Sequence, residues 1–67
     1  MLRKMRKQRK LSQDQLATIS GLHINTIYLL EKGLNEPKLS TFFFIAKAFD
    51  LTPMELMKML TKEYYNE

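Results

Sequence analysis

Two capping boxes fix the starts of two helices in this chain of 67 residues. Ser12 is followed three residues later by Gln15, and Thr52 is followed in the same way by Glu55. In such a box the hydroxyl accepts a hydrogen bond from the backbone N–H of the third helical residue, whose side chain reaches back to the capping residue. Pro53 adds a residue that is preorganised for the first helical position. The sequence therefore predicts helices that begin at about residues 13 and 53.

Glycine and proline divide the remaining chain into short segments. Gly21 and Gly33 suit the left-handed residue that ends a helix, and Pro37 marks the approach to a fourth helix. No strand-like alternation or internal repeat is present. The predicted fold is all-α, with five short helices in one domain over residues 1–67, a helix-turn-helix at about 12–32, and helices four and five at about 39–65.

Apolar residues at helical spacing indicate the core of this domain. Leu2 and Met5 mark the inward side of the first helix, and Ile27 and Leu30 mark that of the third. On the last two helices the expected inward stripes are Leu39, Phe42, Ala46 and Phe49, and then Leu56, Met57, Leu60 and Tyr64.

Basic residues are concentrated in the first half of the chain. Residues 1–33 hold seven basic and two acidic residues, a net charge of +5, whereas residues 34–67 hold four basic and five acidic residues, a net charge of −1. This asymmetry favours a polyanion that meets the N-terminal half. A solvated basic helix is the alternative, and a membrane-surface helix is disfavoured because residues 1–10 offer only Leu2 and Met5 as an apolar face.

The composition argues against several other classes of protein. Without cysteine the chain has no disulfide and no thiolate metal site, which fits a reducing compartment. No apolar run is long enough to span a membrane or to form a signal peptide. There is no nucleophile–base pairing, no glycine-rich phosphate loop and no metal-ligand cluster. We therefore expect a cytoplasmic protein that is not an enzyme and has no metal, cofactor or small-molecule substrate.

Residues 13–30 predict two helices that pack at a steep angle around a tight turn. Gly21 lies in the turn, and Ala17 is small enough to allow a close crossing. Such a unit presents the outer face of its second helix, which fits the major groove of B-DNA.

The chain resembles the lambda-repressor-like, Cro-type helix-turn-helix family over roughly Leu2 to Leu60. The matching motifs are Leu2-Arg3-Lys4-Met5-Arg6-Lys7, Leu11-Ser12-Gln13, Leu16-Ala17, Ser20-Gly21-Leu22, Thr26-Ile27, Leu30-Glu31-Lys32-Gly33, and Pro37 through Leu56. The resemblance implies an ion pair between Arg6 and Glu31 that ties the first helix to the third. The base-reading positions that it implies are Ile24, Asn25, Thr26, Tyr28 and Leu29. The residues that we expect to contact phosphates are Gln13, His23, Lys32, Asn35 and Lys38.

The sequence departs from the family pattern at several of these positions. Ile24 and Leu29 are apolar where family members usually carry polar or basic residues, so they suit thymine methyl groups and leave Asn25 as the best candidate for adenine. His23 replaces the usual Ser or Thr cap, and serves either as a substitute cap or as a phosphate donor. Lys10 replaces a glycine, and a left-handed lysine there would cost about 1–2 kcal/mol.

Apolar residues on the outer side of the last two helices suggest a dimer. Phe44 lies about 200° around the helix from Phe42 and therefore points outward. We expect an interface that includes Phe44, Met54, Met57 and Tyr65. Phe43 and Met57, which flank the inward stripes, fit either the core or this interface. A two-fold dimer would place two recognition helices about 34–36 Å apart, one turn of DNA. The sequence thus predicts a dimeric, sequence-specific regulator of transcription that binds duplex DNA, resembling a repressor or a restriction–modification controller. The alternative is a protein-interaction module of the same fold, like an antitoxin or anti-repressor.

Overall fold

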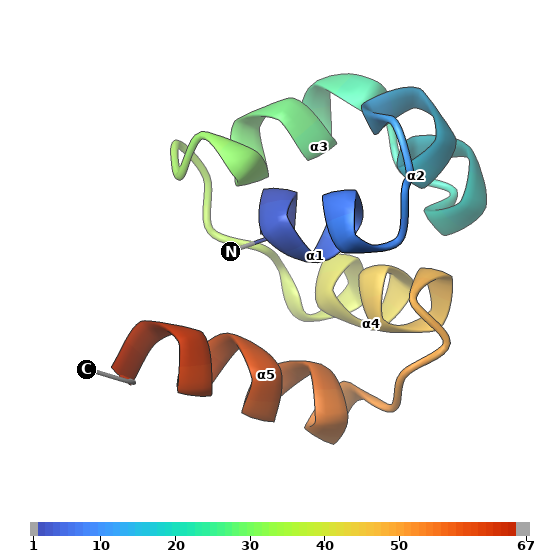
Figure 1. The fold of residues 1–67 in the computed structure, drawn as a ribbon. Coiled ribbons are helices and arrows are strands. Elements are labelled where there is room, and N and C mark those ends of the chain that lie inside the picture. Colours follow the sequence, from blue (N-terminus) through green and yellow to red (C-terminus); the bar gives the residue numbers. More distant parts are fainter. Residues whose placement is uncertain (1, 66–67) are drawn as a thin grey trace.

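The chain folds into five α-helices connected by short loops and turns (Figure 1). The computed structural model describes the backbone of residues 2–65 and the side chains of residues 2–60. The helices are α1 (Leu2–Gln8), α2 (Gln13–Ser20), α3 (Ile24–Glu31), α4 (Leu39–Ala48) and α5 (Pro53–Tyr65). The all-α prediction is confirmed, since residues 2–65 contain these helices and no strand.

Both capping boxes form as the sequence predicts. The Ser12 hydroxyl accepts from the Gln15 backbone N–H at 3.0 Å, and the Ser12 N–H donates to Gln15 Oε1 at 2.8 Å. At the start of α5 the corresponding distances between Thr52 and Glu55 are 3.1 and 2.8 Å. The N–H and hydroxyl of Thr52 hold the pKa of the Glu55 carboxyl below its ordinary value. The side chains next to the first turns therefore set where α2 and α5 begin.

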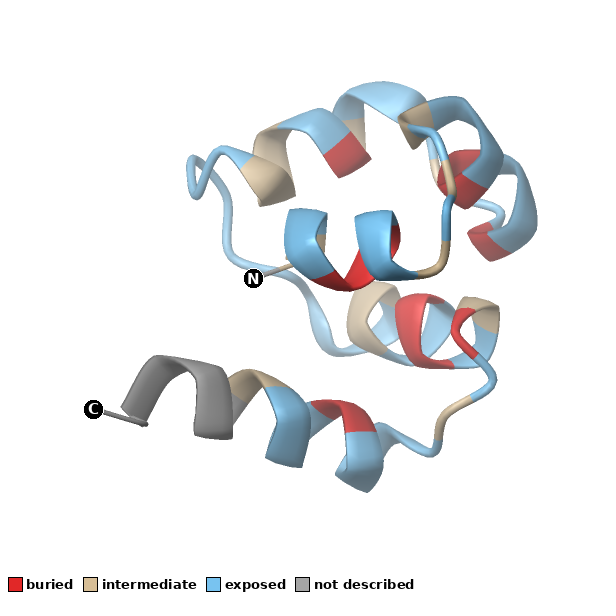
Figure 2. Cartoon of the chain, viewed as in Figure 1, coloured by how far each residue is buried: buried red, intermediate tan, exposed pale blue. Residues whose placement is uncertain are grey.

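The helices surround one small core. In Figure 1, α2 and α3 form the top of the molecule, α1 lies in front beneath α3, α4 lies lower and α5 forms the base. The buried apolar side chains come from all five helices: Met5, Leu16, Ala17, Ile27, Ile45, Ala46, Phe49 and Leu56 (Figure 2). The guanidinium carbon of Arg9 also lies 4.6 Å from the centroid of the Phe49 ring, which joins the end of α1 to α4. The five helices therefore form one packed unit. The outer faces of α3 and α5 lie at opposite ends of it.

The predicted inward stripe of α4 is wrong at its first member. Leu39 is 70% exposed, whereas Ile45, which the prediction omitted, is buried. A helical side chain covers the turn that precedes its own Cα, and Leu39, as the first residue of α4, has no such turn beneath it. The observed stripe starts at the half-buried Phe42 and continues through Ile45 and Phe49.

The predicted stripe of α5 also needs correction. Leu56 is fully buried and Leu60 packs against the core, as expected. Met57 is exposed instead, because two adjacent residues on a helix point about 100° apart and Leu56 already faces α4. The Tyr64 side chain lies outside the described residues.

Four helices end in the same way, at a residue with positive φ that is followed by leucine. The positive-φ residues are Lys10, Gly21, Gly33 and Asp50, with φ between 57 and 75°. In each case the N–H of the following leucine donates to the carbonyl five residues earlier, as from Leu11 to Arg6 at 3.2 Å and from Leu51 to Ala46 at 2.8 Å. This is the Schellman arrangement, which satisfies carbonyls at the helix end. Lys10 therefore has the left-handed conformation that was considered for it from the sequence. Asp50 has the same conformation, which was not predicted.

Candidate nucleic-acid interface

His23 sets the start of α3. Its Nδ1 accepts a hydrogen bond from the backbone N–H of Asn25 at 3.1 Å, so histidine serves as the cap where the family usually has a hydroxyl. A ring nitrogen that accepts carries no hydrogen, and the neutral imidazole then bears its N–H at Nε2. His23 is exposed, which leaves Nε2 available to an outside acceptor such as a phosphate oxygen.

The outer side of α3 carries most of the predicted base-reading residues. Ile24 is 38% exposed, Tyr28 is 44% exposed and Asn25 is exposed, whereas Thr26 and Leu29 are half-buried. At about 100° per residue, Ile24 and Tyr28 follow one edge of this face, and Asn25 and Leu29 follow the other. Ile27 is fully buried on the opposite side of the helix. The structure thus divides the predicted base readers into an apolar edge and an edge that carries an amide.

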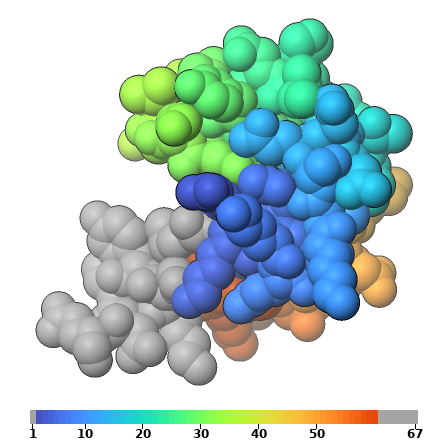
Figure 3. All heavy atoms as spheres, turned by 45° about the horizontal axis from the view of Figure 1, so that its top comes forward, coloured from blue at the N-terminus to red at the C-terminus, as the bar shows by residue number. Residues whose placement is uncertain are grey.

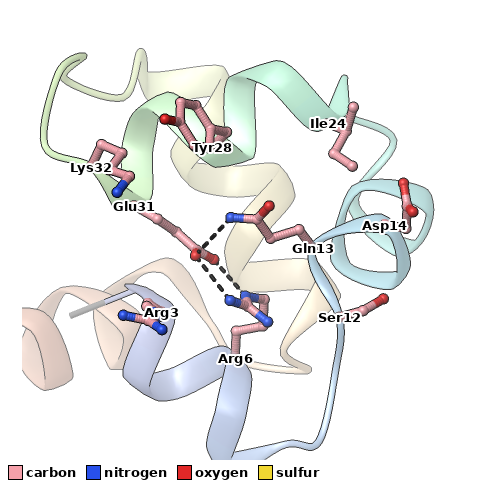
Figure 4. A pocket seen from close by; sticks show the side chains of 9 residues that line it. All are labelled: Arg3, Arg6, Ser12, Gln13, Asp14, Ile24, Tyr28, Glu31 and Lys32. Carbon is pink, nitrogen blue, oxygen red and sulfur yellow. Dashed lines mark hydrogen bonds and ion pairs between the residues drawn. The ribbon is translucent and has the colours of Figure 1, made fainter.

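A polar network beneath the apolar edge joins three helices (Figure 4). Arg6 of α1 donates to both carboxylate oxygens of Glu31 at the end of α3, with distances of 2.6 Å from Nε and 3.0 Å from Nη2. Its Nη1 also donates to the carbonyl of Leu11 at 2.8 Å. Gln13, at the start of α2, donates from Nε2 to Glu31 at 3.1 Å. The fork of Arg6 and the amide of Gln13 therefore hold α1 and α2 against the end of α3.

Hydrogen bonding and charge shift the ionisation of both partners. Burial by itself would raise the pKa of the Glu31 carboxyl, but the hydrogen bonds from Arg6 and Gln13 outweigh burial and hold that pKa below its ordinary value of 4.5. The hydrogen bond to Glu31 raises the pKa of the Arg6 guanidinium. Both groups are therefore charged at neutral pH, and they neutralise each other within the network.

A surface hollow of about 730 Å³ lies above this network, between α1, the start of α2 and α3. Figure 3 shows these three elements on one face of the molecule, and Figure 4 shows the side chains around the hollow. The lining residues are Arg3, Arg6, Ser12, Gln13, Asp14, Ile24, Tyr28, Glu31 and Lys32. Lys32 also places its ammonium 5.7 Å from the centroid of the Tyr28 ring. Since Arg6 and Glu31 are paired with each other, Arg3 and Lys32 are the cations of the hollow that face solvent.

The predicted phosphate-contacting residues do not all gather at this hollow. Gln13 and Lys32 line it, and Gln13 retains one amide N–H and its carbonyl oxygen beyond the bond to Glu31. Asn35 and Lys38 are exposed in the loop between α3 and α4, and His23 lies at the other end of α3. Arg3 was expected only as one of the basic residues of the first helix that neutralise phosphates, and it was not among the named positions, although it lies three residues before Arg6 and therefore near it on α1.

The predicted dimer residues lie away from this face, on α4 and α5. Phe44 is 49% exposed, and Met54 and Met57 are also exposed. Phe43 of α4 and Met59 of α5 add to the exposed apolar surface of these two helices. The Tyr65 side chain lies outside the described residues.

Among the described residues, no group of three or more histidine or carboxylate side chains lies where it could hold a metal ion. None of the described helices is both long and apolar enough to cross a membrane.

The fold and this exposed face define a helix-turn-helix protein of the lambda-repressor-like class, in which α2 and α3 are the two helices of the motif. The helix-turn-helix family model matches residues 2–56, which is most of the chain, and the chain belongs to this family of DNA-binding regulators rather than to a family of enzymes. The chain is similar to the control protein C.SmaI of Serratia marcescens, at 39% identity over 62 residues that cover 92% of this chain and 70% of that protein.

Proposed function

We propose that this regulator binds a specific duplex DNA sequence as a homodimer and controls transcription as a controller-type protein. The observation that carries the proposal is the exposed outer face of α3, with Ile24, Asn25 and Tyr28 directed outward beside the cations Arg3 and Lys32. A helix of this kind fits the major groove, where base edges are distinguishable. The similarity to a control protein supports the regulatory role.

We expect contacts to phosphates to hold α3 in the major groove. Lys32 and Arg3 lie on the α1 side of α3, His23 lies at its start, and Asn35 and Lys38 follow its end. Gln13 contributes its remaining amide N–H from the start of α2. Contacts on several sides of the helix fix its orientation without reading sequence.

Asn25 and Lys32 separate base reading from phosphate contact in an experiment. Asn25→Ala is expected to relax specificity at one position of the site and to cost about 1–3 kcal/mol of binding free energy. Lys32→Ala is expected to weaken binding to all sequences equally and to make the slope of log K against log salt shallower by about 0.9. Lys58→Ala, which removes a lysine of α5, is the matched control. Binding that responds in the same way to all three substitutions would contradict these roles.

The apolar residues of α3 support a second candidate, a protein-interaction module of the same fold. Ile24 and Tyr28 are exposed and Leu29 is half-buried, so α3 could also pack against a protein. In that case Asn25→Ala leaves the sequence preference of DNA binding unchanged, and the salt dependence is weak. The net charge of +5 on residues 1–33 favours DNA over this candidate.

A further inference from the structure

We propose that the Ile24–Tyr28 edge of α3 reads the C5-methyl group of a pyrimidine in the major groove. The inference rests on the proposed function, because it requires α3 to enter that groove. Thymine carries this methyl group, and 5-methylcytosine carries the same group at the same ring position. The expected ligand is therefore a methylated pyrimidine, and uracil and unmodified cytosine lack the feature that is recognised.

The carbon surface of this edge is the first observation. Ile24 and Tyr28 are one helical turn apart, both are exposed, and both line the same hollow (Figure 4). Ile24 has no polar atom in its side chain, so it cannot hydrogen-bond to a base. The thymine methyl group is the apolar feature of the major-groove edge of DNA. An isoleucine that faces this edge therefore gains most where a methyl group meets it.

The core and the dimer surface do not account for the exposure of this edge. The buried side of α3 is formed by Ile27, with Leu30 packed against the core. The exposed apolar residues of α4 and α5 belong to helices that lie below α1 in Figure 1, whereas α3 lies above it. The Ile24–Tyr28 edge is thus a separate apolar surface within the nucleic-acid interface.

Charge separates the two ends of the hollow. Figure 4 draws Arg3 and Lys32 toward one end, and Ile24 with Asp14 toward the other. The cations, one of which lies over the Tyr28 ring, attract the phosphate backbone. At the Ile24 end the charged lining residue is Asp14, so the hollow has no cation there that would draw the backbone over Ile24 itself. A duplex seated by these charges presents a base edge, rather than its backbone, to Ile24.

The test uses purified protein and three pools of random duplexes. One pool contains thymine, the second contains uracil in its place, and the third contains uracil together with 5-methylcytosine in place of cytosine. The thymine pool is expected to yield a motif with thymine at a fixed position of each half-site. Replacing that thymine by uracil is expected to lower affinity about fourfold per methyl group, or about fifteenfold for both half-sites. The third pool is expected to yield 5-methylcytosine at the same position.

Substitutions assign this effect to the proposed edge. Ile24→Ala is expected to reduce the difference between thymine and uracil duplexes, since the shorter alanine side chain covers less of the methyl group. Ile19→Ala is the matched control, because Ile19 is 55% exposed on α2 and does not line the hollow, and this variant is expected to keep the difference.

The outcomes distinguish this inference from the proposed function. If the thymine motif binds equally well when uracil replaces thymine at every position, or if Ile24→Ala remains as sensitive as the unaltered protein, methyl reading is wrong and sequence-specific binding stands. If no pool yields a motif, both the proposed function and methyl reading are contradicted.

Discussion

Glu31 is the residue on which the polar contacts of the site converge. Its carboxylate accepts from Arg6 and Gln13, which come from two other helices, and its side chain is only 4% exposed. The Arg6–Glu31 pair was expected from the family resemblance, because those two positions match the family pattern. The contribution of Gln13 was not expected, since its role had been assigned to phosphate and nothing in its spacing points to Glu31.

Acid is expected to weaken this network. The pKa of Glu31 in the folded protein lies below its ordinary value of 4.5, so the unfolded chain binds a proton more readily. The stabilisation is therefore complete above about pH 4.5 and is lost as the pH falls toward the folded-state pKa. Glu31→Gln is expected to lower the free energy of unfolding at neutral pH by about 1–3 kcal/mol. It should also make the acid loss of stability smaller than in the unaltered protein.

Denaturant unfolding at pH values from about 3 to about 7 measures both the free energy of unfolding at neutral pH and its loss in acid. Glu36→Gln, in the exposed loop after α3, provides the control and should follow the unaltered protein. The same acid dependence in all three proteins would show that Glu31 does not carry the stabilisation.

At the scale of helices, local sequence determined most starts, and tertiary packing determined which faces are buried. The capping boxes at Ser12 and Thr52 depend on residues three positions apart, so they are readable without the fold. The burial of Ile45 and the exposure of Leu39 depend on where α4 meets its neighbours, which helical spacing alone does not specify. The ends at Lys10 and Asp50 carry no glycine, but the leucine that follows each is a signal that could have identified them.

The two kinds of left-handed helix end give opposite predictions for substitution. Lys10→Gly is expected to stabilise the protein by about 0.5–1 kcal/mol, because glycine relieves more backbone strain than it costs in unfolded-chain entropy. Gly21→Ala is expected to destabilise it by about 1 kcal/mol through φ alone, because a Cβ at Gly21 would meet no atom within 4 Å. Thermal and denaturant unfolding compare the variants. A destabilising Lys10→Gly would mean that the lysine side chain makes a contact that outweighs the strain.

For the whole molecule, the sequence predicted which helices carry the candidate interface, but it did not predict how the residues of that interface are arranged. Charge asymmetry and the helix-turn-helix spacing indicated α3 and the N-terminal half, and the structure gathers Arg3, Gln13, Tyr28 and Lys32 at one hollow. The separation of the Ile24–Tyr28 edge from the Asn25–Leu29 edge depends on how α1 and α2 pack against α3. Sequence alone could list those residues but could not assign them to sides.

The exposed surface of α4 and α5 gives a prediction about assembly. If the chain forms the proposed dimer through α4 and α5, Phe44→Glu is expected to convert it to a monomer, because the substitution places a charge within the proposed apolar contact surface. Sedimentation equilibrium measures the change in mass. Ile19→Glu places the same charge at another exposed apolar position and should leave the mass unchanged. A Phe44→Glu protein that remains dimeric would place the interface elsewhere.

Selection of bound duplexes from a random pool tests whether α3 reads duplex DNA in a two-fold complex. We expect recovery of a symmetric motif whose half-sites are about 10 base pairs apart, with binding that weakens steeply as salt is raised. Recovery of unrelated sequences, with binding that does not depend on salt, would contradict it.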